Sequence, residues 1–194
     1  MIELWVMRHG KTRLNRDKLA NLNKKKAYPL QKKVYNESIL PSSIKDIKGI
    51  SKKLKNKKID IIFCSELKRS IETANIIKKE LGCNKVIIDK RLNEVNYGIF
   101  EGKIFDEIKF LKKEKEKKGD IFEIKFPEGE KLGEVNHRIN SFLNCLKKNY
   151  DGKKILLVTH YTPIKMILIK FLNRGDINKI LIKGVNKSLF NFII

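Results

Sequence analysis

The chain opens with seven residues that are apolar except for Glu3, and it turns polar at Arg8-His9-Gly10. An apolar run of this kind predicts a strand buried on both faces, as at the centre of a parallel sheet. Its carboxyl end lies where α/β proteins bind their ligands. Guanidinium groups match oxyanions, and imidazole can act as a nucleophile or acid–base group, so the Arg8-His9 pair predicts a phosphate-handling site. An Arg-His pair also occurs at ordinary surface turns, and the rest of the chain decides between the two interpretations.

Strands and helices are predicted to alternate along the rest of the chain. Further strands are expected over 59–64, 86–88 and 154–159, with a final pair over 180–183 and 188–194. Helices are expected after Pro41, after Ser65, over 103–118, after Glu130 and from Thr162. This order predicts an α/β three-layer sandwich with a mainly parallel central sheet and helices on both faces, in one domain over residues 1–194.

The sequence also predicts local details of these elements. A Ser is expected as N-cap of the helix after Pro41, and Ile44 is expected on its buried face with Ile47, Ile50 and Leu54. Gly82 is expected to end the second helix, and Pro163 is expected at the first position of the last one. Residues 11–41 are expected to form a long loop.

Composition narrows the class of protein. The 194 residues include 44 Lys and Arg against 22 Asp and Glu, a net charge of +22. The basic residues are scattered along the chain, which favours solvated faces that steer anionic substrates over a dedicated nucleic-acid surface. No apolar run has the length of a membrane helix and no signal peptide is recognised, so a cytoplasmic location is expected. The three separated cysteines predict reduced thiols, with Cys64 more readily a small buried residue than a catalytic thiol.

Polar groups recur where the predicted strands end. The first strand ends at Arg8 and His9, the second leads through Ser65 to Arg69, and the fourth ends at His160. The loop after the third strand adds Glu94. Because parallel strands present their carboxyl ends at one edge, we expect these groups to converge although they are distant in sequence.

These residues lie in stretches that resemble the motifs of the histidine phosphatase, or phosphoglycerate mutase-like, superfamily. Arg8-His9-Gly10-Lys11-Thr12 is similar to the Arg-His-Gly-x-Thr signature of that family, and Asn15 stands where the family often has Asn. The other stretches that resemble its motifs, in family order, are Ser65-x-Leu67-x-Arg69-x-x-x-Thr73-Ala74, Leu92-x-Glu94-x-x-x-Gly98-x-x-Glu101-Gly102, Phe126-Pro127-x-Gly129-Glu130 and Val158-Thr159-His160.

The resemblance implies a mechanism and a set of roles. His9 would attack phosphorus and become a transient phosphohistidine, and Glu94 would protonate the leaving oxygen. Arg8, Arg69 and His160 would stabilise the phosphoryl oxygens. The further substrate- or phosphate-binding residues that we expect are Thr12, Asn15, Tyr161 and Glu130. For Glu130, a place at the pocket mouth and a solvated place in the first helical turn remain equal alternatives. No cofactor and no metal are expected.

Three positions depart from the usual family pattern. Lys11 stands where Glu or Gln is common, Tyr161 replaces a usual Gly after the second His, and Cys64-Ser65 replaces a common Ser-Ser. A bulky Tyr161 would narrow the pocket or stack on a substrate. These departures bear on substrate preference more than on the chemistry.

The resemblance favours the phosphatase branch, including the α-ribazole phosphatase-like members. Val95-Asn96 stand where mutases carry basic residues, and Glu101-Gly102 is similar to phosphatases, whereas Tyr97 keeps a cofactor-dependent phosphoglycerate mutase as the runner-up. A non-catalytic, basic nucleic-acid-binding protein on the same fold is the alternative of another class. The expected partners are a small phosphorylated substrate and inorganic phosphate as product, without membrane or nucleic acid, and a homodimer is left open.

Overall fold

The computed structural model describes residues 1–13, 15, 36–83, 85–101, 107–172 and 189–194. Its strands are β1 (Glu3–Arg8), β2 (Ile61–Cys64), β3 (Lys85–Ile88), β4 (Lys154–Thr159) and β5 (Leu189–Ile193). Its α-helices are α2 (Ser43–Leu54), α3 (Lys68–Leu81), α4 (Glu107–Lys118), α5 (Leu132–Asn149) and α6 (Tyr161–Leu172). Short 3-10 turns lie at Lys55–Lys57, Lys90–Leu92, Gly98–Phe100 and Ile121–Glu123.

The strands form one sheet in the order β3-β2-β4-β1-β5. The first four run parallel, and β5 pairs antiparallel with β1 at the edge. The expected α/β architecture with a mainly parallel sheet is confirmed. Arg8 is in register with Thr159, and Cys64 with Val158, so β1, β2 and β4 end at the same edge of the sheet.

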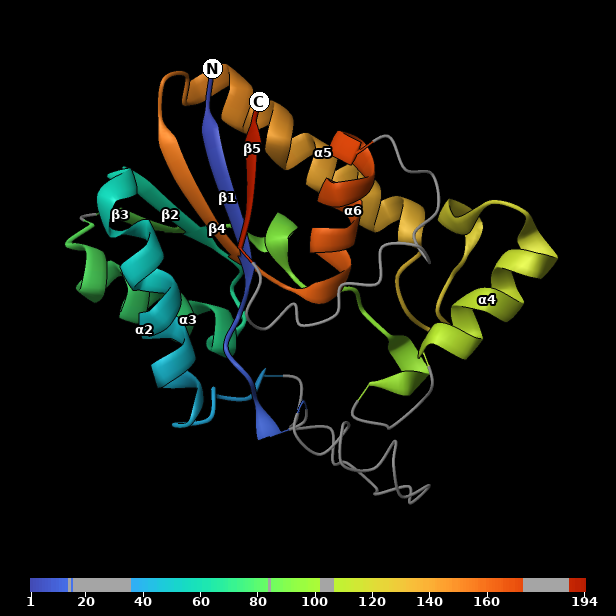
Figure 1. The fold of residues 1–194 in the computed structure, drawn as a ribbon. Helices are drawn as coiled ribbons and strands as arrows, with labels where there is room; N and C mark the ends of the chain where they lie inside the picture. The colour runs from blue at the N-terminus through green and yellow to red at the C-terminus, as the bar shows by residue number, and fades with distance from the viewer. Residues whose placement is uncertain (14, 16–35, 84, 102–106, 173–188) are drawn as a thin grey trace.

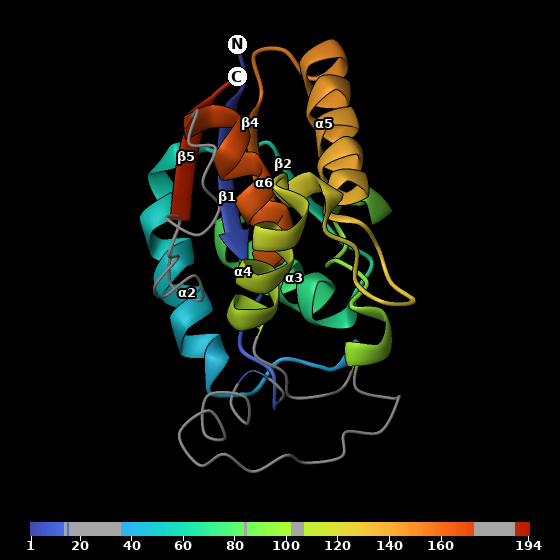
Figure 2. The same ribbon diagram turned by 90° about the vertical axis from the view of Figure 1, so that its right-hand side faces the viewer.

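Helices cover both faces of the sheet, α2 and α3 on one and α5 and α6 on the other (Figures 1 and 2). Alternate side chains of each strand point to opposite faces, which separates the core into two clusters. Leu4 and Val6 of β1 belong to the cluster on the α5 and α6 side. Trp5 and Met7 belong to the cluster on the α2 and α3 side.

Most of the predicted elements occur, with shifted ends. The fourth strand has the predicted bounds, and α5 follows Glu130 as expected, with Leu132, Val135, Ile139, Phe142 and Leu146 among its buried residues. Gly82 ends α3 with a φ of 65°, a left-handed conformation that glycine adopts without strain. The expected strand over 180–183 lies outside the described residues, as do residues 103–106 of the helix expected over 103–118.

The structure corrects two details at helix starts. Ile44, the second residue of α2, is 38% exposed, whereas Ile47 and Ile50 are buried. Pro163 is the third residue of α6, not the first, because the helix already begins at Tyr161. A proline is still tolerated there, since the first-turn N–H groups have no partner within the helix. Ser42 is the N-cap of α2, but its side chain makes no capping hydrogen bond.

Cys64 is a core residue. Its side chain is fully buried in the cluster under α2 and α3, and burial raises the pKa of its thiol to about 11. A thiol with such a pKa is almost entirely protonated at neutral pH and is a poor nucleophile. The structure therefore supports the interpretation of Cys64 as a small buried residue.

The two ends of the expected 11–41 loop lie side by side. Thr12 pairs with Ile39 in an isolated antiparallel bridge, and the Leu40 N–H donates to the Lys11 carbonyl at 2.7 Å. Residues 14 and 16–35, which make up most of the loop, lie outside the described part of the chain. No helix among the described residues is long and apolar enough to cross a membrane.

Candidate active site

Two histidines lie next to one another where β1 and β4 end. His9 follows β1, His160 follows β4, and their ring centroids are 4.9 Å apart. The backbone N–H of His9 donates to the Thr159 carbonyl at 3.0 Å, which extends the pairing of β1 and β4 by one residue. Both rings are almost fully buried. The parallel register of neighbouring strands therefore places two imidazoles, 151 positions apart in the chain, in one cluster.

The His9 ring has a defined tautomer. Its Nδ1 lies 2.7 Å from the Gly10 carbonyl oxygen, and because a carbonyl only accepts, Nδ1 must carry the hydrogen. Arg69 Nε–H donates to Nε2 at 3.2 Å, which agrees with a lone pair there. Burial lowers the pKa of His9 well below its usual value, and the charges of Arg8 and Arg69 lower it further. The ring is thus neutral, with its nucleophilic nitrogen turned towards Arg69.

Gly10 allows β1 to turn close under α2. A side chain at this position would bring Cβ to 2.9 Å from Ile47 Cδ1 and to 3.2 Å from atoms of both Ile39 and Ser43. The Gly10 N–H donates to Thr73 Oγ1 at 2.9 Å. The lack of a side chain therefore lets the backbone that carries His9 approach its neighbours.

Thr73 also fixes the position of Arg69. Its hydroxyl donates to the Arg69 carbonyl at 2.7 Å, one turn earlier in α3, while accepting the hydrogen bond from Gly10. Arg69 lies in the first turn of α3, directly after the loop that follows β2. A single threonine hydroxyl therefore ties the start of α3 to the turn that carries His9.

His160 is buried beside Ser65, whose Oγ lies 2.6 Å from His160 Nε2. Burial lowers the pKa of His160 well below its usual value, and the neighbouring His9, Arg69, Arg8 and Arg138 lower it further. The Ser65 hydroxyl accepts the Leu67 N–H at 3.3 Å and can donate its own hydrogen to Nε2. With that donation, the neutral His160 ring carries its proton on Nδ1.

Glu94 lies beside His160 because it binds the start of α6. Its Oε2 accepts the Tyr161 N–H at 3.1 Å, and its Oε1 accepts the N–H groups of Thr162 and Val95, each at 3.1 Å. N–H groups in the first helical turn have no partner within the helix, and a carboxylate there also interacts favourably with the helix dipole. These bonds hold Glu94, in the loop after β3, next to the start of α6, which follows β4 and His160.

Three buried polar atoms at this edge have no hydrogen-bond partner among the described residues: Arg8 Nε, His160 Nδ1 and Thr162 Oγ1. Buried polar atoms without a partner are uncommon and often mark functional sites. Arg8 Nε–H is a donor, as is His160 Nδ1–H in the tautomer inferred above. Two donors of this kind beside the His9 ring suit an anionic ligand that accepts hydrogen bonds.

Tyr161 contacts two cations. The Arg8 guanidinium carbon lies 5.6 Å from the centre of its ring, and the Lys165 ammonium nitrogen lies 4.0 Å from the same centre. Lys165 is one turn further along α6, and its side chain is buried. Tyr161, which stands where the family usually has Gly, therefore packs against the Arg8 guanidinium.

The structure brings the five principal candidates together, whereas Thr12, Asn15 and Glu130 make other contacts. The Thr12 N–H donates to Asn15 Oδ1 at 3.2 Å, and the Asn15 N–H donates to Thr12 Oγ1 at 3.4 Å. Glu130 precedes α5 and pairs with Arg138, so it does not lie in the first turn of the helix, and a place at the pocket mouth stays a prediction. The binding roles of these three residues remain predictions.

Sequence reasoning assigns no role to three residues that lie at or beside the site: Ser65, Glu101 and Arg138. Ser65 and Glu101 stand within the recognised motifs, so the motifs themselves contained the signal. Burial raises the pKa of the Glu101 carboxyl, as does the charge of Glu94, while the Tyr97 N–H and Arg69 act in the opposite direction. Arg138 sits eight residues after Glu130, and no local pattern indicates that it reaches the loop of Glu94.

The donor chemistry of the cluster is that of an anion site. The described residues contain no group of three or more His, Cys, Asp or Glu side chains arranged to hold a metal ion. The cluster instead combines two guanidinium groups, two neutral imidazoles and one carboxylate. Such a set can bind a phosphoryl group, attack it and supply a proton.

Comparison with known proteins agrees with this chemistry. The family model described as "Histidine phosphatase superfamily (branch 1)" matches residues 4–189. The chain is 28% identical over 166 residues to "Probable phosphoglycerate mutase GpmB" of Escherichia coli, covering 82% of this chain and 70% of that protein.

Solved structures show the same fold. A mycobacterial glucosyl-3-phosphoglycerate phosphatase has a TM-score of 0.74 at 18% identity, covering 97% of this chain and 90% of that one. Phosphoserine phosphatase from Entamoeba histolytica has a TM-score of 0.71 at 21% identity, covering 100% and 91%. Identities this low establish the fold alone, whereas the family model spans nearly the whole sequence. The chain therefore belongs to the histidine phosphatase superfamily, branch 1.

Proposed function

We propose that the protein hydrolyses phosphomonoesters of small metabolites, and that His9 is the group that is transiently phosphorylated. The observation that carries the proposal is the state of the His9 ring. It is buried and neutral, its Nδ1–H is held by the Gly10 carbonyl, and its Nε2 lone pair faces Arg69. A neutral imidazole with a fixed tautomer beside two guanidinium groups suits attack on a bound phosphoryl group.

In the first step, the Nε2 lone pair of His9 forms a bond to phosphorus while the bond from phosphorus to the ester oxygen breaks. Arg69 gives up its contact with Nε2 and donates to the phosphoryl oxygens instead, together with Arg8 and His160. Glu94 acts as the general acid, which delivers a proton to the leaving oxygen so that an alcohol is released. Among the described residues, Glu94 Oε2 accepts a single N–H, so its second lone pair is available for that proton.

In the second step, water attacks the phosphohistidine. Its proton passes to the Glu94 carboxylate, its oxygen bonds to phosphorus, and the bond from phosphorus to Nε2 breaks. Inorganic phosphate leaves, and His9 is again neutral. The same two groups therefore serve both steps, Glu94 first as acid and then as base.

The comparisons support a small phosphorylated substrate without identifying it. The similar structures include a phosphoserine phosphatase and a glucosyl-3-phosphoglycerate phosphatase, whose names specify substrates of those proteins only. The curated relative is named a probable phosphoglycerate mutase, which favours a mutase as the second candidate. A mutase would return the phosphoryl group to a second hydroxyl of the substrate in place of water.

The test is hydrolysis of p-nitrophenyl phosphate by the wild type, His9→Ala and His137→Ala. We expect turnover by the wild type, retained in EDTA, and acid-labile phosphate bound to the protein after rapid quenching. His9→Ala should lose both signals, by about 10³-fold or more in rate, because no other group replaces the nucleophile. His137 is exposed on α5, so His137→Ala should behave like the wild type.

Two outcomes would overturn the proposal: no turnover of any member of a phosphomonoester panel, or acid-labile phosphate that persists on His9→Ala. A coupled assay with 3-phosphoglycerate separates the two candidates. Release of inorganic phosphate supports the phosphatase, whereas formation of 2-phosphoglycerate without phosphate release supports the mutase.

A further inference from the structure

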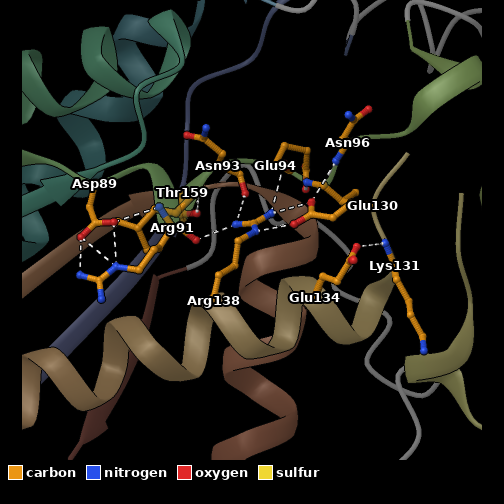
Figure 3. A network of polar contacts seen from close by, with 12 residues as sticks. Asp89, Arg91, Asn93, Glu94, Asn96, Glu130, Lys131, Glu134, Arg138 and Thr159 are labelled. Atoms are coloured by element: carbon orange, nitrogen blue, oxygen red, sulfur yellow. Dashed lines mark hydrogen bonds and ion pairs between the residues drawn. The ribbon is translucent and has the colours of Figure 1, made fainter. Parts of the chain in front are cut away.

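The loop that carries Glu94 is held by side chains. The four consecutive backbone carbonyls of residues 91–94 each accept a hydrogen bond from a side chain elsewhere in the protein (Figure 3). Thr159 donates to the second of them at 2.6 Å, and Arg138 donates to the other three at 2.6, 2.7 and 3.3 Å. Residues 91–94 follow β3 and belong to no strand. Side-chain donors therefore take the place of the backbone hydrogen bonds that a neighbouring strand would supply.

Arg138 uses every N–H group of its guanidinium. Three of its five N–H donors bind the loop carbonyls, and the other two bind Glu130, with Nε–H donating to Oε1 at 2.8 Å and Nη2–H donating to Oε2 at 3.1 Å. The Arg138 and Glu130 side chains are only 17% and 20% exposed. A lysine has three donors on a single nitrogen and cannot reproduce this planar arrangement.

The Arg138–Glu130 pair holds the loop on both sides of Glu94. Glu130 Oε2 also accepts the Asn96 N–H at 3.2 Å, and the Glu130 N–H donates to the Asn96 carbonyl at 2.9 Å. The backbone on either side of Glu94 is therefore fixed from α5 and the turn before it, while the carboxylate is fixed by the start of α6.

We propose that Arg138, buttressed by Glu130, is a positioning residue that sets where the Glu94 carboxylate lies relative to the leaving oxygen. The inference rests on the proposed function, because it assumes that Glu94 is the proton donor. A proton donor must lie within hydrogen-bond reach of its acceptor, so a loosened loop should impair proton transfer more than nucleophilic attack. This selectivity distinguishes positioning from general support of the fold.

The test compares two substrates that differ in their need for a proton. p-Nitrophenolate leaves as a stable anion, whereas the alkoxide of glycerol 2-phosphate must be protonated as it leaves. The value of kcat/KM reports the steps up to phosphorylation of His9, and it is measured for both substrates with Arg138→Met and Arg138→Lys. We expect kcat/KM to fall about 10- to 100-fold for glycerol 2-phosphate and by less than about threefold for p-nitrophenyl phosphate.

Arg91→Met is the matched control. Arg91 is on the same loop, and its side chain pairs with Asp89 at 2.6 Å and donates to Ser141 Oγ at 3.3 Å, whereas the Arg138 side chain donates to the loop carbonyls. Arg91→Met should leave the ratio of the two kcat/KM values unchanged. Glu94→Gln is the reference, since it removes the proton donor itself, and the Arg138 variants should shift the ratio in the same direction.

Each result is decisive. Equal losses for the two substrates in Arg138→Lys with a native unfolding midpoint, or the same shifted ratio in Arg91→Met, overturn the positioning role while leaving the proposed phosphatase activity intact. A wild type that hydrolyses no member of the phosphomonoester panel overturns both. Arg138→Lys retains the charge and much of the packing, so it keeps the test decisive if Arg138→Met does not fold.

Discussion

At the scale of single residues, burial keeps the two histidines of the cluster neutral. Desolvation is the largest cause of the lowered pKa of His9 and of His160, and neighbouring cations add to it. An unfolded chain exposes both rings to water, where a histidine has a pKa of about 6.5. Below that pH the unfolded state binds more protons than the folded state, so stability falls as pH decreases.

We therefore expect the free energy of unfolding to be unaffected by these rings above about pH 7 and to decrease below about pH 6.5. Between pH 7.5 and 5.5 each ring should contribute a loss of at most about 1.4 kcal/mol. Urea unfolding at the two pH values measures it. His9→Gln and His160→Gln should each reduce the loss, and exposed His137→Gln should not. An unchanged loss in the first two variants would contradict the neutral buried state.

At the scale of elements, a buried hydroxyl connects α3 with the turn after β1. Thr73 is fully buried, and it bonds both the Gly10 N–H and the Arg69 carbonyl. The sequence predicts α3, because apolar residues recur at helical spacing. It does not predict this contact, because the partners lie 63 positions apart.

Thr73→Val keeps the shape of the side chain and leaves the buried Gly10 N–H without an acceptor. We expect a loss of about 1–3 kcal/mol in the free energy of unfolding, and a lower kcat/KM because Arg69 and His9 lose their common anchor. Denaturant unfolding and steady-state kinetics measure the two effects. Thr73→Ser retains the hydroxyl and should restore most of kcat/KM; failure to do so would refute the role of this hydrogen bond.

At the scale of the whole molecule, the sheet divides the core into two clusters, and the larger one lies under α5 and α6. Phe142 of α5 is fully buried there, with its ring centre 5.4 Å from that of Phe63 on β2. On its other side, the Arg91 guanidinium carbon lies 5.3 Å from the same ring. Phe142 thus links the sheet, α5 and the loop that leads to Glu94.

Phe142→Ala should destabilise the protein by about 3–5 kcal/mol, because it removes a large apolar side chain and leaves a cavity in the core. Thermal or urea unfolding measures the change. Ile88→Ala on β3 is the control, since Ile88 is 54% exposed, and its effect should stay within about 0.5 kcal/mol. Similar effects of the two substitutions would contradict the assignment of Phe142 to the main core.

The sequence by itself determined the fold class, the strands β1, β2, β3 and β4, and the convergence of Arg8, His9, Arg69, Glu94 and His160. Local periodicity indicates each element. Because parallel strands place their carboxyl ends at one edge of the sheet, the pattern of strands already predicts that the residues after them lie close together. Only the tertiary structure decided the orientation of the groups: the Nδ1–H tautomer of His9, the binding of Glu94 to the start of α6, and the pairing of Glu130 with Arg138. These depend on side-chain conformation and on how the elements pack, which leave no period in the sequence whether the partners are adjacent, as His9 and Gly10 are, or distant, as Glu94 and Tyr161 are.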